Sequence, residues 1–209
     1  MAIILLVRHA VTEETGKRLY GRQPGVHLSE AGRRQAQEVA ARLRELSLAA
    51  VYSSPLERCM ETAAPIAETL GLDVIVEPDL VETDTGAWTG KTFGQIGRTR
   101  RWRRILMVPS SARLPEGESA TEVHARSVRA IERIAERHPR APVVVVSHGD
   151  PIRLVLAHYA GLHLDLFQRL EVAPASVSVV ATGDHGPRVI RVNDRGTLSD
   201  LVPRRTGRR

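Results

Sequence analysis

Two arginines and two histidines stand at the ends of apolar segments that are far apart in this chain of 209 residues. Arg8-His9 follows an apolar run at the start, Arg58 comes a few residues after a second run, and His148 follows a third. Because ligands of open α/β sheets bind at the carboxyl ends of the strands, we expect these four side chains to converge there. Two fixed positive charges beside two imidazoles, with no cysteine or carboxylate cluster, suit an anionic substrate. Phosphate is the best candidate.

Each of these residues allows more than one interpretation when it is taken alone. Either histidine can serve as the nucleophile, because a neutral imidazole attacks phosphorus, and residue type alone does not rank His9 above His148. Arg58 lies near the start of an expected helix, where backbone N–H groups also attract anions. Gly149 allows the backbone to approach a ligand closely. Any one of them could be an ordinary surface or structural residue, so the hypothesis depends on their combination.

Phosphoryl transfer also requires a proton donor for the leaving oxygen. The candidate carboxyl groups are Glu82, Asp84, Glu116 and Glu118. Glu82 stands where a strand is expected to end and a loop with glycine and tryptophan begins, which is a natural place for a positioned carboxyl group. A solvated loop acid is the alternative interpretation for any of the four.

The elements that must position these residues alternate between apolar runs and amphipathic stretches. This order predicts an α/β protein of three layers, α/β/α, with a doubly wound, mostly parallel sheet and a helical cap insertion. We expect strands at 2–7, 49–52, 74–76, 142–146, 177–181 and 189–192, the last two forming a hairpin. We expect helices that begin after Ser29, at Ser53 or Ser54 with Pro55 in the first turn, near Thr121 and at Pro151, and Gly71 is expected to end the second of them.

Residues 1–200 are predicted to form one domain, in which a segment at about 83–118 is either a functional cap or weakly ordered. The formal net charge of +6 raises the question of nucleic-acid binding. However, aromatic residues make up only 3% of the chain, and much of the positive charge lies in Arg98–Arg104 and in the tail 201–209, which we expect to be disordered. We therefore expect no nucleic-acid partner. For most arginines of 98–104 we favour a solvated helix face over recognition of a second anion.

The single cysteine, Cys59, excludes an intrachain disulfide and favours a reducing cytoplasm. Its neighbour Arg58 is expected to lower the pKa of the thiol, although the small apolar residues around it favour a buried residue over a nucleophile. The apolar run at the start is too short for a membrane span or a signal peptide. We expect a cytoplasmic protein with no membrane partner, and a homodimer as the default oligomeric state.

Six motifs occur in order along the chain between about residue 3 and residue 181. They are Arg8-His9, Leu28–Gly32, Ser53–Arg58 with Thr62-Ala63, Glu82 to Gly90, Pro115–Ser119 and Ser147–Gly149. Together they resemble the signatures of the histidine phosphatase superfamily, specifically its phosphoglycerate-mutase-like branch. The resemblance covers most of the chain, and a chance coincidence of six ordered motifs is very improbable.

The resemblance implies separate roles for the converging residues. His9 would be the phosphorylated nucleophile, and the two arginines and His148 would surround the phosphoryl group, with the Gly149 N–H nearby. Glu82 would protonate the leaving group and then activate water. The implied activity is that of a metal-independent phosphomonoester hydrolase without a cofactor, acting on a small phosphorylated metabolite.

A few positions depart from the family pattern. Ala10 stands where the family has glycine, and Thr15 stands where relatives commonly have an asparagine that contacts phosphate. Thr15 or Thr12 would replace that contact through a hydroxyl group. Arg22 and Gln23, in the loop after the first motif, are weaker candidates for substrate contacts.

Two other functions remain as alternatives at this stage. A cofactor-dependent phosphoglycerate-type phosphomutase would form the same phosphohistidine, but such mutases of the family are generally longer. A non-catalytic phospho-ligand or RNA-binding module is the alternative of another class. The fold does not choose the substrate, since relatives act on different phosphorylated compounds.

Overall fold

The chain folds around one six-stranded sheet, and the computed structural model describes residues 1–183 and 186–196. Its strands are β1 (Ala2–Arg8), β2 (Val51–Ser53), β3 (Val74–Val76), β4 (Val143–Ser147), β5 (Val177–Thr182) and β6 (Arg188–Asp194). Its α-helices are α1 (Glu30–Leu43), α2 (Glu57–Leu70), α3 (Phe93–Ile96), α4 (Arg100–Met107), α5 (Ala120–Arg137) and α6 (Gly149–Tyr159). Short 3₁₀ helices are η1 (Pro78–Leu80), η2 (Gly86–Trp88), η3 (Pro109–Ser111) and η4 (Leu164–Arg169). The tail predicted at 201–209 lies outside the described residues.

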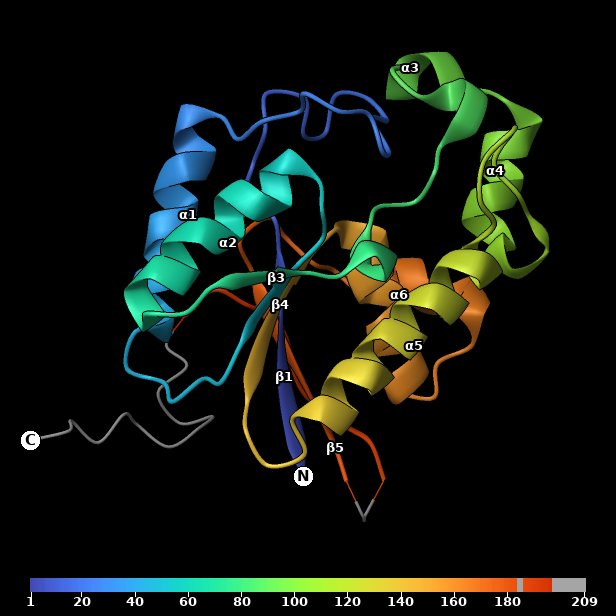
Figure 1. Ribbon diagram of the computed structural model, residues 1–209. Helices are drawn as coiled ribbons and strands as arrows, with labels where there is room; N and C mark the ends of the chain where they lie inside the picture. The colour runs from blue at the N-terminus through green and yellow to red at the C-terminus, as the bar shows by residue number, and fades with distance from the viewer. Residues whose placement is uncertain (184–185, 197–209) are drawn as a thin grey trace, which may run out of the picture.

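The strands lie in the order β3-β2-β4-β1-β5-β6. β3, β2, β4 and β1 pair in parallel, and β5 and β6 add an antiparallel edge. Helices α1 and α2 cover one face of the sheet, and α5 and α6 cover the other (Figure 1). The prediction of a three-layer, doubly wound and mostly parallel fold is confirmed.

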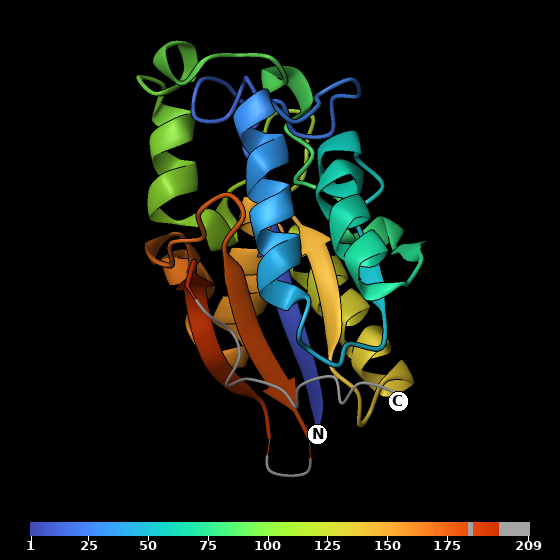
Figure 2. The ribbon, with the colours of Figure 1, turned by 90° about the vertical axis from the view of Figure 1, so that its left-hand side faces the viewer.

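Strand β4 shows why the layers form. All five of its residues are buried, as its continuous run of valines predicts for a strand covered on both faces. Because side chains alternate along a strand, Val144 and Val146 pack into the core beneath α1 and α2, whereas Val143 and Val145 face α5 and α6. Figure 2 shows the first of these faces, with α1 and α2 over the strands.

Several helix ends follow from local chemistry and are confirmed. The Ser29 side chain accepts a hydrogen bond from the Gly32 N–H at the start of α1. Gly71 ends α2 in the left-handed conformation that glycine adopts at little cost. The predicted hairpin of β5 and β6 is also present.

Two predicted helix starts are wrong. α2 begins at Glu57 rather than at Ser53 or Ser54, and Pro55 lies before it. The Ser54 hydroxyl bonds to a histidine ring of the site described below, so it does not cap the helix. α6 begins at Gly149, two residues before the predicted Pro151. Pro151 is tolerated inside the first turn because a backbone N–H at that position would have no intrahelical partner.

The segment between residues 83 and 118 contains α3, α4 and two short 3₁₀ helices, so it is an ordered cap rather than an irregular stretch. It lies above the carboxyl ends of the parallel strands (Figure 1). Trp88, Ile96 and Leu114 form a small core of its own, against which Trp102 packs. No helix in the described part of the chain is long and apolar enough to cross a membrane.

Gly32 is expected to be essential for packing α1 against the loop that follows β1. A Cβ atom there would lie 2.0 Å from the Val11 carbonyl oxygen, so the loop would have to move. We expect Gly32→Ala to lower the free energy of unfolding by roughly 2 kcal/mol in urea denaturation. Gly94→Ala is the control, because the nearest atom to its Cβ would be 3.8 Å away. Equal effects of the two substitutions would contradict this explanation.

Candidate active site

The register of the central strands brings the two histidines together. Arg8 of β1 stands opposite Ser147 of β4, so His9 and His148 follow directly at the ends of neighbouring strands. The His9 N–H donates to the Ser147 carbonyl oxygen at 2.9 Å. The two imidazole rings meet edge to face with their centroids 5.2 Å apart, and both are buried.

The surroundings of His9 define which of its nitrogens is free. Its Nδ1 lies 2.8 Å from the carbonyl oxygen of Ala10. A carbonyl oxygen only accepts hydrogen bonds, so Nδ1 carries the proton and Nε2 holds a free electron pair. Burial, reinforced by the charges of Arg58 and Arg8, holds the pKa of His9 well below its usual value. The ring is therefore a neutral imidazole with Nε2 available as a nucleophile.

His148 is held differently. Its Nε2 lies 2.8 Å from the Ser54 hydroxyl oxygen, and its Nδ1 lies 3.9 Å from a carboxyl oxygen of Glu82. Burial comes first among the causes that lower the pKa of His148 well below its usual value, followed by the charge of Arg58 and then by the neighbouring His9 ring. An anion bound between the rings and the arginines would favour the protonated form of this histidine.

Cys59 packs beneath the site, with its Sγ 3.4 Å from Nε2 of His148. The prediction of a buried residue is confirmed. The prediction of a lowered pKa for this thiol is wrong. Burial raises the pKa of the Cys59 thiol by more than the charge of Arg58 lowers it. A neutral buried thiol is a poor nucleophile.

Arg58 is a fully buried cation with unused donors. Its Nη2 donates to the Gly21 carbonyl oxygen at 2.8 Å, and its guanidinium carbon lies 4.7 Å from the centre of the Tyr20 ring. Its Nε and Nη1 find no partner among the residues that the structure describes. Burying such donors without a partner is costly, so they indicate a position for an anion.

Arg8 provides a second guanidinium at the same place. Its Nη1 donates to the Val172 carbonyl oxygen at 2.6 Å, and its buried Nε also has no partner within the described residues. Gly149, at the start of α6, leaves this group accessible. Its missing Cβ would lie 3.4 Å from the Arg8 guanidinium carbon. The two arginines and the start of a helix thus form a cationic floor, meaning Arg8, Arg58 and the first turn of α6.

Glu82 lies beside this floor, two residues after η1. Its Oε1 accepts a hydrogen bond from the Thr83 N–H at 2.8 Å. Burial and then the nearby negative charge of Asp150 raise the pKa of Glu82 above its usual value. A carboxyl group that keeps its proton to higher pH suits a proton donor.

Two arginines hold the backbone of the Glu82 loop. Arg22 Nε and Arg126 Nη2 both donate to the Glu82 carbonyl oxygen, at 2.9 and 3.0 Å. Both also form ion pairs with Glu118, at 2.8 and 3.0 Å. Arg22 was a candidate for substrate contacts, but the structure places it behind the loop and away from the pocket wall. Glu118 and Asp84, two of the alternative proton donors, are occupied in bonds that shape this loop.

The structure does not bring the remaining candidates to the pocket wall. The Thr12 N–H donates to the Thr15 hydroxyl oxygen at 2.9 Å, and the two hydroxyl oxygens lie 3.0 Å apart. They shape a turn in the loop after His9. Gln23 is exposed, and only its backbone N–H is bonded, to the Tyr20 carbonyl oxygen.

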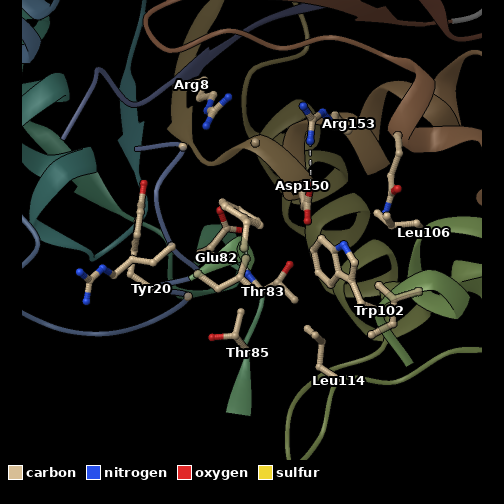
Figure 3. Close-up of a pocket in the computed structure, with 18 residues that line it drawn as sticks. Arg8, Tyr20, Glu82, Thr83, Thr85, Trp102, Leu106, Leu114, Asp150 and Arg153 are labelled. Atoms are coloured by element: carbon tan, nitrogen blue, oxygen red, sulfur yellow. Dashed lines mark hydrogen bonds and ion pairs between the residues drawn. The ribbon is translucent and has the colours of Figure 1, made fainter. Parts of the chain in front are cut away.

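A pocket of about 380 Å³ adjoins the site beneath the cap. Arg8, Glu82 and Gly149 line it, whereas the buried side chains of His9, Arg58 and His148 do not. Figure 3 shows Trp102, Leu106 and Leu114 on one side of this pocket and Tyr20 on the other, with Glu82 between them. Every arginine of the cap segment 98–104 is exposed, and none of them lines the pocket, in agreement with the solvated face that we favoured.

Sequence reasoning missed several residues that complete the site. Tyr20 covers Arg58, Ser54 bonds to His148, and Asp150 raises the pKa of Glu82. Ser54 could have been found from its position at a strand end, and Tyr20 from the scarcity of aromatic residues. The carbonyl oxygens that hold the arginines have no sequence signal. Among the described residues, no group of three histidine, cysteine, aspartate or glutamate side chains could hold a metal ion.

Comparison with known proteins places the chain in a family. A sequence model of the histidine phosphatase superfamily (branch 1) matches residues 4–195. The chain is 33% identical over 195 residues to phosphoserine phosphatase 1 of Hydrogenobacter thermophilus, covering 92% of each protein. A solved mycobacterial glucosyl-3-phosphoglycerate phosphatase superposes with a TM-score of 0.83 at 28% identity, over 91% of this chain and 98% of that one. The chain belongs to the histidine phosphatase superfamily.

Some relatives are much longer than this chain. It is 38% identical over 198 residues to a bifunctional protein of Mycobacterium tuberculosis. That match covers 93% of this chain, but the chain spans only about half, 54%, of the relative.

The unused donors of Arg58 lead to a prediction about stability. Inorganic phosphate should stabilise the wild-type protein against heat, by about 2.7 kcal/mol at a hundredfold excess over its dissociation constant. We expect Arg58→Met to abolish this shift, and to leave the protein without phosphate no less stable, because a buried unpartnered charge is removed.

Thermal denaturation with and without phosphate measures both effects. Arg101→Met, on the exposed face of α4, is the matched control and should keep the full shift. Retention of the shift by Arg58→Met would show that phosphate does not bind at this guanidinium.

Proposed function

We propose that the chain is a metal-independent phosphomonoesterase that acts through a phosphohistidine at His9. The observation that carries the proposal is the neutral ring of His9, with its Nε2 electron pair free beside the unused donors of Arg8 and Arg58. The names of the phosphoserine phosphatase and the glucosyl-3-phosphoglycerate phosphatase support the class of reaction.

In the first step, Nε2 of His9 attacks phosphorus and the bond to the leaving oxygen breaks. Negative charge spreads over the phosphoryl oxygens, and Arg8, Arg58 and a protonated His148 neutralise it. The leaving oxygen takes the proton of Glu82, whose raised pKa keeps that proton available.

In the second step, water attacks the phosphohistidine and gives its proton to the Glu82 carboxylate. The bond between phosphorus and nitrogen breaks, inorganic phosphate leaves, and His9 returns to its neutral form. The arginines neutralise the negative charge of the phosphoryl oxygens, so no metal ion is needed for this task. A chelator should therefore leave the rate unchanged.

Further proposals concern the substrate, the location and the partners of the enzyme. We propose a small phosphorylated substrate, a cytoplasmic location and no nucleic-acid partner. A phosphomutase would transfer the phosphoryl group back to its substrate instead of to water, and a non-catalytic binding module would form no phosphoenzyme.

Trapping the phosphoenzyme tests the role of His9. 4-Nitrophenyl phosphate is the suitable substrate for this test, because its leaving group needs no proton from Glu82. Glu82→Gln should release about one equivalent of nitrophenolate in a burst and then turn over at least tenfold more slowly than wild type, since no base activates water. His9→Ala should give no burst and no acid-labile protein phosphate.

His163→Ala is the matched control, because this exposed histidine lies away from the site, and it should label like the wild type. Labelling of His9→Ala would refute the assignment of the nucleophile. Rapid exchange between phosphoglycerates without phosphate release would instead identify a mutase.

The pH dependence of kcat/KM for an alkyl phosphate, whose leaving group needs a proton, tests the role of Glu82. Activity should fall as pH rises through the raised pKa of Glu82, because the proton donor is lost, and should fall at low pH as His9 becomes protonated. Asp150→Asn removes one of the causes that raise the pKa of Glu82, so the high-pH limb should move to lower pH while the low-pH limb stays. An unchanged high-pH limb would exclude Glu82 as its origin.

A further inference from the structure

The outer part of the pocket carries positive charges that are already neutralised within the chain. Arg18 forms an ion pair with Glu14. Arg153 pairs with Asp150 at 3.0 Å and also donates to the Leu170 carbonyl oxygen at 3.0 Å. These are the two arginines that line the pocket besides Arg8. Neither needs an anionic group of a substrate.

The cationic floor, which reaches this pocket through Arg8, differs sharply. Among the described residues, the buried guanidinium nitrogens without a partner are Nε of Arg8 and Nε and Nη1 of Arg58. This unused positive charge suits one phosphoryl group, whereas the two other arginines of the pocket wall are already paired with carboxylates. Glu82 and Asp150 also line the wall, and neither offers a cation to a carboxylate on the leaving group.

Much of the remaining wall is apolar, although Thr83, Thr85 and Gln168 also line it. The chain has only two tryptophans, three tyrosines and two phenylalanines, yet Tyr20, Phe93 and Trp102 all line this pocket. Leu106 and Leu114 lie beside Trp102 in Figure 3. Such a wall binds hydrocarbon by removing it from water.

The cap helix α4 explains why the pocket wall is apolar although the cap segment is rich in arginine. It presents Trp102, Ile105 and Leu106 to the pocket, while Arg101 and Arg103 are exposed on its outer side. The basic composition of the helix therefore contributes no charge to the substrate pocket. A leaving group held by this wall contacts aromatic and aliphatic carbon.

We propose that the substrate is a monoester with one phosphoryl group and an uncharged, apolar leaving group, such as an alkyl or arylalkyl alcohol. This inference depends on the proposed phosphatase activity and specifies its substrate class. It separates the chain from phosphatases whose substrates carry a carboxylate next to the phosphate.

A chain-length series of n-alkyl phosphates, from ethyl to octyl, tests the proposal. From ethanol upward, the leaving alcohols are nearly equal in acidity, so the series measures binding rather than reactivity. We expect kcat/KM to rise about two- to fourfold for each added methylene until the pocket is filled. The upper value corresponds to a transfer free energy of ~0.8 kcal/mol. Phosphoserine and 3-phosphoglycerate should be at least tenfold poorer substrates than butyl phosphate.

Two neighbouring substitutions on α4 provide the matched comparison. Leu106 lines the pocket and is 41% exposed, whereas Met107 is 69% exposed and does not line it. Leu106→Gln should reduce kcat/KM several-fold more for hexyl phosphate than for ethyl phosphate. Met107→Gln should behave as wild type with every substrate.

The outcomes separate this inference from the proposed function. A flat chain-length series, or a preference for phosphoserine or 3-phosphoglycerate, would overturn the substrate class while leaving the phosphatase activity intact. Equal chain-length dependence in the wild type and Leu106→Gln would also overturn it. Absence of phosphate release from every compound would refute the phosphatase activity itself, and the inference with it.

Discussion

Buried positive charge that no carboxylate of the described residues pairs with is the constraint on which the site depends. Arg58 is fully buried, yet two of its nitrogens have no partner in the described part of the chain, and Arg8 has one such nitrogen. The protein keeps these groups in place through carbonyl oxygens of Gly21 and Val172, which orient a guanidinium without cancelling its charge. Burial, together with these two charges, keeps His9 neutral. This cationic floor therefore prepares both the anion site and the nucleophile.

Charge is distributed along the pocket in a way that defines its two ends. At the floor, cations are held by neutral oxygens, so their charge is available to a ligand. At the outer wall, Arg18 and Arg153 are held by carboxylates, so their charge is not available. The same residue type thus has opposite consequences, depending on whether a carbonyl or a carboxylate holds it. Counting arginines near a pocket would miss this difference.

The sequence predicts the strands, most helix ends and the convergence of Arg8, His9, Arg58 and His148, because these depend on local apolar runs and on the geometry of parallel strands. It fails where a side chain has a distant partner. Ser54 has the right type for a helix cap, but its hydroxyl bonds to a histidine 94 residues away. The pocket wall was missed for a similar reason, because the arginines of α4 dominate its sequence while its tryptophan and leucine face the pocket. Only the tertiary arrangement decides which partner such a side chain binds and which side of a helix faces the pocket.

The Glu82 loop shows how a carboxyl group can be positioned without being neutralised. Arg22 and Arg126 donate to the Glu82 carbonyl oxygen, and Glu118 balances both arginines. Arg126 also donates to the Asp79 and Val81 carbonyl oxygens, so one side chain holds three carbonyl oxygens of the segment 79–82. An arginine paired directly with the Glu82 carboxyl group would lower its pKa and remove the proton that the leaving group needs. Because Arg22 and Arg126 bind the backbone carbonyl oxygen of Glu82 and not its carboxyl group, they position the proton donor while its pKa stays raised.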